Sequence, residues 1–490
     1  MTDLPSVEEC SDFLLCSQCI HDEYFAKQVN ALRNEGVCSY CGEKEPCISI
    51  LDASIIIESV FDRHFQRAAM EPNFYQSMML RDKEMSYDFE PDGEPTIFAI
   101  MNLANIPERA AHDIQRVLYE KHTDWDSQVA GEMTPFDDEL HYEESQIDDA
   151  SWHRQWYEFE QSLKTETRFF NRRGEELLKR IFDGLEDLKT NNGGGLIVAG
   201  GPDSKYEYLF RARAFQDEDQ LKEAMIHPDR LLGPPPARVA RAGRMNAHGV
   251  SVFYGATIPK VAIAEVRPPV GSRVLVGPFR IIRPLRLLNL TALKELRRSG
   301  SLFDKSFSDF LERANFLRSF TDHMSIPVMP DRETLDYLPT QAVADFLATD
   351  ENLLLDGIIF PSVQSGFAGE NVVLFQKASR VSTVEVPSGS EMEARTWQEY
   401  NEGFEDEFSV WIETPAIVEA HSETPRPCTE WGSSLDCSDD ASFPSPPLER
   451  EISLEVILDE LKVEIVKMVE FSTDSNRVTR HQMTKQDPAF

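Results

Sequence analysis

Apolar side chains recur at spacings of three and four residues through most of the region between residues 50 and 190. The segments SIIIESVFDRHFQRA (54–68) and WHRQWYEFEQSLKTETRFFNRRGEELLKRIFDGLEDL (152–188) each place one apolar stripe along a helix. The second pattern ends at KTNNGGG (189–195), where Asn and Gly are strong stop signals. We therefore expect a helical domain over residues 51–190.

The pattern changes from Leu196 onward to short β-rich runs that are separated by Gly and Pro. These runs are YEYLFRARAF (206–215), GVSVFYGA (249–256), SRVLVGPFRII (272–282), GIIFPS (357–362) and NVVLFQKA (371–378). Helical patterns occur near 291–320 and 340–350, and regular βα alternation is absent. We therefore expect an α+β domain over residues 196–384, with mostly antiparallel sheets.

The carboxyl-terminal region has two different textures. Residues 385–450 are acidic and rich in Ser and Pro, which predicts a flexible segment. Residues 451–471 end in LKVEIVKMVEF, whose alternating apolar positions predict a helix or strand that returns to the core of the preceding domain.

Charge narrows the classes of partner. The chain has 490 residues, with 49 Lys and Arg against 85 Asp and Glu, so its formal charge of −36 disfavours broad attraction to nucleic acid or anionic lipid. Arg residues cluster in 230–244 and 280–288, so these segments are positively charged within an acidic chain. This local charge indicates a pocket for a small anion. The sequence contains no membrane-length apolar run, and the opening residues lack a signal-peptide pattern, so we expect a cytoplasmic protein.

Cysteine spacing predicts a metal site in residues 1–50. Cys16 and Cys19 form one C-x-x-C pair and Cys38 and Cys41 another, with 18 residues between the pairs. This spacing is typical of a structural zinc knuckle closed by four thiolates, and the intervening residues could form a helix. Disulfides are the alternative. The other four cysteines are expected to be spare thiols: Cys10, Cys47, Cys428 and Cys437.

Several ordered blocks in the β-rich domain resemble the RES family, which is named after an Arg, a Glu and a Ser. The blocks are YLFRARAF, AGRMNAHGVSVFYGA, AIAEV, PTQAVADFL and DGIIFPSVQSGFAGENVVLF, and together they span about residues 205–378. The preceding region is similar to the amino-terminal domain of long RES proteins, which is assigned to the HEPN-like helical class.

The resemblance implies an ADP-ribosyltransferase-like fold and chemistry on NAD as the substrate. Family members degrade NAD by phosphorolysis or hydrolysis, or transfer ADP-ribose to a protein acceptor, and many are toxins paired with a separate Xre-type antitoxin. The catalytic positions would be Arg211, Tyr254, Glu265 and Ser362. The cofactor-binding positions would be Arg213, Arg244, Asn246, Gln341 and Asn371. Whether the chain forms an oligomer stays open.

These residue types suit cleavage of the bond between ribose and nicotinamide. The guanidinium groups of Arg211 and Arg244 can hold the two phosphates of NAD. Glu265 can stabilise an oxocarbenium-like ribosyl cation. Tyr254 can stack on a base while its hydroxyl donates a hydrogen bond, and Ser362 can bind phosphate or ribose.

Other readings remain for the same residues. Glu265 could mark the polar face of a short helix that Thr257 caps and Pro259 begins. A degenerate RES pocket would make the protein a nucleotide-sensing binding module. A HEPN ribonuclease would need an Arg followed four to six residues later by His, which Arg168 lacks, although His153 is nearby.

Overall fold

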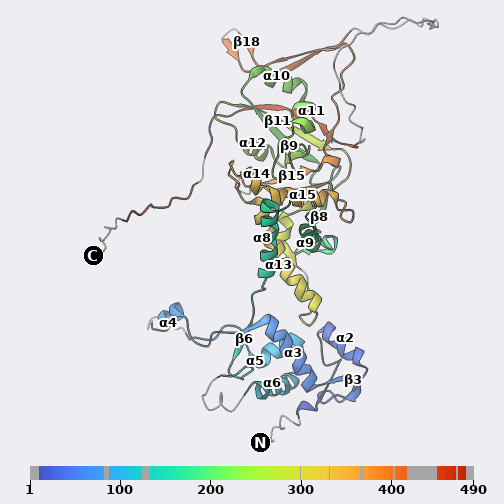
Figure 1. Ribbon diagram of the computed structural model, residues 1–490, viewed down its shortest axis with the longest axis vertical. Helices are drawn as coiled ribbons and strands as arrows, with labels where there is room; N and C mark the ends of the chain where they lie inside the picture. The colour runs from blue at the N-terminus through green and yellow to red at the C-terminus, as the bar shows by residue number, and fades with distance from the viewer. Residues whose placement is uncertain are drawn as a thin grey trace, which may run out of the picture. The chain divides into compact units, whose positions relative to one another are not determined.

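The structure, a computed structural model, divides into two units. It describes residues 10–81, 88–123, 133–297, 299–329, 331–364, 366, 369–400, 403–415, 450–470 and 473–481. Unit 1 comprises Met1–Gly194 and Leu293–Phe320, and unit 2 comprises Gly195–Ala292 and Thr321–Phe490 (Figure 1). Residues 293–320, which the sequence pattern placed within the β-rich domain, therefore group with the amino-terminal unit.

Unit 1 begins with a small sheet around the cysteines. Its strands lie in the order β1 (Leu14–Cys16), β3 (Lys44–Ser49) and β2 (Glu35–Val37). The expected helix between the two C-x-x-C pairs is present as α2 (Glu23–Leu32). It is capped by Asp22, whose carboxylate accepts a hydrogen bond from the Phe25 N–H at 2.8 Å.

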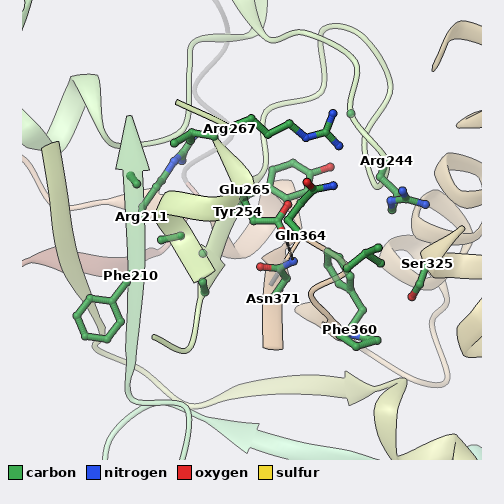
Figure 2. Close-up of a pocket in the computed structure, with 18 of the residues that line it drawn as sticks. Phe210, Arg211, Arg244, Tyr254, Glu265, Arg267, Ser325, Phe360, Gln364 and Asn371 are labelled. Atoms are coloured by element: carbon green, nitrogen blue, oxygen red, sulfur yellow. Dashed lines mark hydrogen bonds between the residues drawn. The ribbon is translucent and has the colours of Figure 1, made fainter. Parts of the chain in front are cut away.

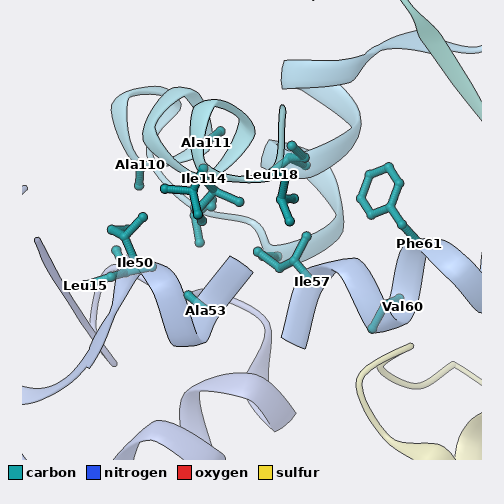
Figure 3. Packing of buried hydrophobic residues seen from close by; sticks show 14 of the residues in the cluster. Leu15, Ile50, Ala53, Ile57, Val60, Phe61, Ala110, Ala111, Ile114 and Leu118 are labelled. Atoms are coloured by element: carbon teal, nitrogen blue, oxygen red, sulfur yellow. The ribbon is translucent and has the colours of Figure 1, made fainter. Parts of the chain in front are cut away.

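Three helices form the main core of unit 1. They are α3 (Ile50–His64), α5 (Thr96–Ala104) and α6 (Glu108–His122). In Figure 3, Ile50 and Ile57 of α3 face Ile114 and Leu118 of α6, and all four side chains are fully buried. Removal of this apolar stripe from water is the main force that holds the helices together.

The rest of unit 1 mixes helices with short strands. The remaining helices are α4 (Phe74–Arg81), α8 (Ala150–Thr165), α9 (Arg172–Phe182) and the first part of α13 (Lys305–Ser325). A small sheet of β4 (Phe65–Arg67), β6 (His141–Glu144) and β5 (Glu94–Pro95) interrupts the helices, and β7 (Lys189–Thr190) pairs with β13 (Leu296–Arg297). The region expected to be a helical domain therefore also contains short strands.

Unit 2 is built on a ten-stranded sheet, counted over the described residues, in the order β16-β21-β11-β9-β10-β15-β14-β12-β8 with β22 also paired to β11. The strands are β8 (Ile197–Gly200), β9 (Tyr208–Phe215), β10 (Phe253–Ala256), β11 (Arg273–Ile281), β12 (Leu285–Asn289), β14 (Gly357–Pro361), β15 (Glu370–Leu374), β16 (Arg380–Val381), β21 (Ile452–Val456) and β22 (Lys462–Ile465). Among the described strand pairs of this sheet, only β12–β14 and β16–β21 are parallel. This confirms the predicted α+β class with mostly antiparallel sheets.

Short helices accompany this sheet. They are α10 (Glu218–Ile226), α11 (Pro228–Leu231), α12 (Pro259–Glu265), α14 (Glu333–Asp336) and α15 (Leu338–Thr349). Pro259 begins α12 as expected, but the N-cap residue is Ile258 rather than Thr257. The Thr257 hydroxyl instead donates to the Glu370 carbonyl at 3.2 Å. Across the described residues, none of the helices combines the length and apolar character that a bilayer span requires.

The carboxyl-terminal segment, expected to return as a helix or strand, pairs with β11 through both β21 and β22. Part of the segment expected to be flexible is also ordered, because β17 (Glu391–Arg395) pairs with β20 (Ser409–Glu413) and β18 (Gln398–Tyr400) pairs with β19 (Gly403–Glu405). Cys428, Cys437 and Phe471 lie outside the described residues.

The returning segment contributes to the core of unit 2, and this can be measured. Leu454 on β21 is fully buried in the main apolar cluster, whereas Leu458 is 45% exposed. We expect Leu454→Ala to lower the free energy of unfolding by about 2–5 kcal/mol, because it deletes buried methyl groups and leaves a cavity. Leu458→Ala is the matched control and should change it by less than about 0.5 kcal/mol in urea denaturation. Equal effects of the two variants would contradict the assignment.

Candidate functional site

A cavity of about 330 Å³ opens in unit 2 beside the middle of the sheet, and Figure 2 shows the residues around it. This volume is at the small end of the range for ligand pockets. Residues from β9, β10, α12, β14 and β15 line the cavity, together with the loops beside them. They include Phe210, Arg211, Gly243, Arg244, Tyr254, Glu265, Arg267, Ser325, Tyr337, Phe360, Gln364 and Asn371.

Glu265, the last residue of α12, is held by two donors. The Ser362 hydroxyl and the Asn371 amide each donate to its Oε1 atom at 2.7 Å. Ser362 and Asn371 are both buried, but Glu265 itself is exposed rather than partly buried as its apolar neighbours suggested. In the described part of the chain, the side-chain hydrogen bonds to Glu265 end on Oε1, and Oε2 has no protein donor.

Strand pairing brings these groups together. Asn371 on β15 lies opposite Ala256 of β10 on one side and Phe360 of β14 on the other. Glu265 lies on α12, which follows β10, and Ser362 follows β14. Because β15 pairs with both strands, its register places Asn371 within reach of Glu265. A slip of one residue would turn the Asn371 side chain to the opposite face of the sheet.

Arg211 on β9 presents a cation that lacks a protein partner for one nitrogen. Its Nη1 atom is buried and makes no hydrogen bond, and its Cζ atom lies 5.2 Å from the centre of the Phe253 ring. Burial, with a contribution from the nearby Arg213 charge, lowers the pKa of Arg211 to about 10. The guanidinium therefore stays protonated at neutral pH and can donate to an anion in the cavity.

Arg244 supplies a second cation from the loop that precedes β10. Its Nη1 donates to the Met324 carbonyl at 3.1 Å, and its Cζ lies 5.4 Å from the centre of the Tyr337 ring. Burial lowers the pKa of Arg244, while the negative charge of Glu265 acts in the opposite direction. Cation–π contact with Tyr337 helps to fix the guanidinium at the cavity wall.

Tyr254 organises the same loop. Its hydroxyl accepts a hydrogen bond from the Met245 N–H and donates to the Asn246 side-chain oxygen, both at 2.9 Å. A Cβ atom at Gly243 would lie 2.8 Å from that hydroxyl, so only glycine fits there. Burial raises the pKa of Tyr254, and the phenol therefore stays protonated. Its hydroxyl is occupied by the loop, which leaves the ring face for a ligand.

The nine expected site residues fall into three groups. Arg211, Tyr254, Glu265, Arg244 and Asn371 line the cavity. Ser362 is not among the described residues that line it, but its hydroxyl donates to Oε1 of Glu265.

The other three expected ligand-binding residues are used elsewhere. Asn246 donates to the carbonyls of Arg241, Ala247 and Val250, and Gln341 donates to the Gly243 carbonyl at 2.8 Å. Arg213 donates to the Leu231 carbonyl at 3.1 Å. None of the three is among the described residues that line the cavity, so the expectation that they touch the cofactor is not supported by this geometry.

The structure adds lining residues that the sequence patterns did not single out. Ser325 has a buried hydroxyl oxygen with no hydrogen-bond partner, and Arg267, Tyr337 and Gln364 also line the cavity. Arg267 had a weak signal, since it follows Glu265 by two residues. Ser325 ends α13 and Tyr337 lies in the turn between α14 and α15, and only the tertiary fold brings them to the site.

The four cysteines of the two C-x-x-C pairs converge in unit 1. Their Sγ atoms all lie within 4.8 Å of one another, with 3.6 Å between Cys16 and Cys41 and 3.9 Å between Cys19 and Cys38. A tetrahedral site with zinc–sulfur bonds of about 2.3 Å needs sulfur separations of about 3.8 Å, so the cluster is compatible with a zinc knuckle. All six described cysteines are free thiols, which does not support the disulfide alternative.

Two residues beside this cluster, Tyr40 and Cys47, make hydrogen bonds to other parts of unit 1. Tyr40, between the second pair of cysteines, donates from its hydroxyl to Asp113 of α6 at 2.9 Å. Cys47 is buried beside the cluster and donates to the Glu45 carbonyl at 3.2 Å. The tyrosine therefore attaches the knuckle to the helices of unit 1, and Cys47 has a backbone partner of its own.

Comparison with known families agrees with the sequence resemblance over part of the chain. The model of the RES domain matches residues 209–398. The match begins in β9 and ends in β18, so it includes Arg211, Glu265 and Ser362 and extends beyond the expected end at residue 384. This family is associated with NAD-utilising, toxin-like enzymes. No curated protein sequence matches the chain.

Because the charge of Arg211 lacks a full set of partners, we expect this residue to lower the stability of the fold while it strengthens binding of an anion. We expect Arg211→Met to raise the free energy of unfolding by about 1–3 kcal/mol, because an apolar side chain replaces a buried cation with an unsatisfied nitrogen. The same variant should weaken binding of inorganic pyrophosphate at least tenfold. Urea denaturation and isothermal titration calorimetry measure the two effects.

Arg213→Met is the control for that experiment. It removes an exposed arginine on the same strand that does not line the cavity. Its effect on unfolding should stay within about 0.5 kcal/mol, and pyrophosphate binding should be retained. A loss of stability in Arg211→Met as large as that of a core truncation would show that the arginine is structural.

Proposed function

We propose that unit 2 cleaves the N-glycosidic bond between nicotinamide and ribose of NAD. The observation that carries this proposal is a Glu265 carboxylate with one oxygen fixed by Ser362 and Asn371, in the same cavity as the unsatisfied guanidinium of Arg211. The RES domain match over residues 209–398 supports the choice of an NAD-utilising enzyme.

The carboxylate is suited to stabilising positive charge on the ribose. Cleavage of the glycosidic bond transfers the bonding electron pair to the nicotinamide nitrogen, which leaves as a neutral molecule without needing a proton. The ribosyl carbon becomes oxocarbenium-like, and the free Oε2 atom of Glu265 can face this charge or accept a hydrogen bond from a ribose hydroxyl. Because Oε1 is already fixed, little reorganisation is needed when the charge develops.

The two arginines and the aromatic ring can bind the other parts of NAD, its diphosphate and a base. Arg211 and Arg244 offer guanidinium groups to the diphosphate, where charge-assisted hydrogen bonds are strong. Tyr254 offers a ring face for a base. Ser362 and Asn371 act as positioning residues for Glu265, while Asn246 and Gln341 position the loop that carries Arg244.

The nucleophile determines which of three reactions follows. Water would give ADP-ribose, inorganic phosphate would give its phosphate ester, and a protein side chain would become ADP-ribosylated. Product analysis with and without phosphate distinguishes these outcomes. A separate antitoxin of the Xre type is the partner that a toxin-like RES enzyme would need.

We also propose that Cys16, Cys19, Cys38 and Cys41 hold a structural zinc ion. Four thiolates leave no open coordination position, which fits a structural metal better than a catalytic one. The hydrogen bond from Tyr40 to Asp113 would then connect the metal-bound knuckle to α6 and help to hold the two together.

A ribonuclease function in unit 1 is less well supported. Within unit 1, Arg116 and His122 on α6 form an Arg–His pair at a suitable spacing, which the Arg168 region lacks. However, Arg116 donates to the Cys10 sulfur at 3.3 Å, while His122 lies 2.6 Å from a Glu58 oxygen. The two side chains therefore have different partners, and the acidic composition also disfavours RNA.

Replacement of Glu265 tests the enzymatic proposal. We expect Glu265→Gln to lower kcat for nicotinamide release from NAD by about 10²–10³-fold, because the neutral amide cannot stabilise the ribosyl cation. Ser362→Ala and Asn371→Ala should lower kcat by less, since each leaves one of the two donors to Oε1. Chromatographic measurement of nicotinamide gives all four rates.

Glu455→Gln provides the matched control. Glu455 is an acid on β21 of the same sheet and contacts Arg280 rather than the cavity. Its activity should equal that of the native chain. Nicotinamide binding and thermal stabilisation by NAD without any turnover would instead support a nucleotide-sensing module.

Metal analysis tests the zinc proposal. We expect one zinc ion per chain, lost in Cys38→Ser together with thermal stability of unit 1, because metal binding contributes directly to folding of such knuckles. Cys47→Ser should retain the metal, since Cys47 is a neighbouring thiol outside the cluster. Elemental analysis of both purified variants measures this, and full zinc retention by Cys38→Ser would refute the assignment.

A further inference from the structure

Arg267 has an unusual backbone conformation at the end of α12. Its φ angle is +44°, in the left-handed region, and its N–H donates to the Ala264 carbonyl at 3.1 Å. Helices commonly end with a residue in this conformation, but the residue is usually glycine or asparagine because a side chain is strained there. The chain thus keeps a long cationic side chain at a position where local stability favours glycine.

The left-handed turn brings the Arg267 side chain to the cavity. Arg267 lines it from an exposed position, and Figure 2 shows the side chain extended above Glu265 and Tyr254, with its guanidinium toward the side where Arg244 lies. Among the described residues, no hydrogen bond or ion pair holds the Arg267 guanidinium.

The electrostatics of this side of the cavity favour an anion. The positive charge of Arg267 is among the causes that lower the pKa of Arg244, so the two cations repel each other. Both charges also act on the Tyr337 phenol, which places all three groups in one region. An anion with several oxygens would relieve this repulsion and provide the partner that Arg267 lacks.

We propose that Arg267, together with Arg244, binds the diphosphate of the substrate at the mouth of the cavity and thereby selects phosphorylated nucleotides over neutral nucleosides. The backbone strain at residue 267 is maintained because this is the conformation that directs the guanidinium over Glu265. The proposal rests on the proposed function for turnover, but its binding component stands independently of that function.

Arg267→Gly tests this role with a readout that a structural residue would not give. We expect the KM for NAD to rise about tenfold or more with little change in kcat, as for loss of a charge-assisted hydrogen bond made equally in the ground and transition states. The KM for nicotinamide riboside should not change. The melting temperature should equal or exceed that of the native chain, because glycine removes the strain. Arg267→Lys should retain part of the NAD affinity.

Arg33→Gly is the matched control. Arg33 is also an exposed arginine in the left-handed region, with φ +53°, at the end of α2 in unit 1. It should share the effect on melting temperature but leave the KM for NAD unchanged. A KM for NAD in Arg267→Gly equal to that of Arg33→Gly would overturn the proposal, as would equal rises for NAD and nicotinamide riboside.

Direct binding separates this proposal from the reaction. ADP and adenosine are titrated calorimetrically into the full native chain and both glycine variants. We expect ADP to bind the native chain and Arg33→Gly with equal affinity and Arg267→Gly about tenfold more weakly, while adenosine does not distinguish the three. If NAD is not cleaved but ADP binding depends on Arg267, the proposed function fails and the anion site stands. No ADP binding, or equal binding by all three chains, refutes the site.

Discussion

The pairing register of β15 is the constraint on which the site depends. This strand lies between β10 and β14, and Asn371 is paired with Ala256 on one side and Phe360 on the other. The same register orders the backbone before Ser362, so both donors to Glu265 are placed by one strand. Both faces of β15 are buried, with Val372 and Leu374 in the main apolar cluster. Because side chains alternate across a sheet, a slip of one residue would place Asn371 on that apolar face and away from the carboxylate.

The cavity gathers positive charge within a strongly acidic chain. Among the described lining residues, Arg211, Arg244 and Arg267 stand against a single carboxylate, Glu265, while the formal charge of the whole chain is −36. Burial lowers the pKa of Arg211 and of Arg244, which means that each cation is less stable in the folded protein than in water. Sites that are organised before the ligand binds commonly carry such a cost in stability.

The sequence predicted the elements of unit 2 better than the contacts between them. Short β-rich runs separated by Gly and Pro located β9, β11 and β15, and Pro259 located the start of α12, because these signals are local. The hydrogen-bond partners of the polar side chains depend on tertiary contacts, which local sequence signals do not reveal. Asn246 and Gln341 are occupied by loop carbonyls, and the association of residues 293–320 with unit 1 depends on tertiary packing. The direction of the Arg267 side chain depends on the left-handed backbone conformation of that residue, which the sequence did not predict.

The two oxygens of Glu265 explain why a serine and an asparagine are both present. In the proposed reaction this carboxylate stabilises a developing cation, a role that needs a fixed orientation and an unoccupied oxygen. Ser362 and Asn371 donate to the same atom, Oε1, at 2.7 Å, so neither competes for Oε2. Donors on both oxygens would have fixed the side chain equally well, but they would have reduced the negative charge that the carboxylate can offer to the proposed cation. Convergence on one oxygen therefore combines rigidity with electrostatic strength.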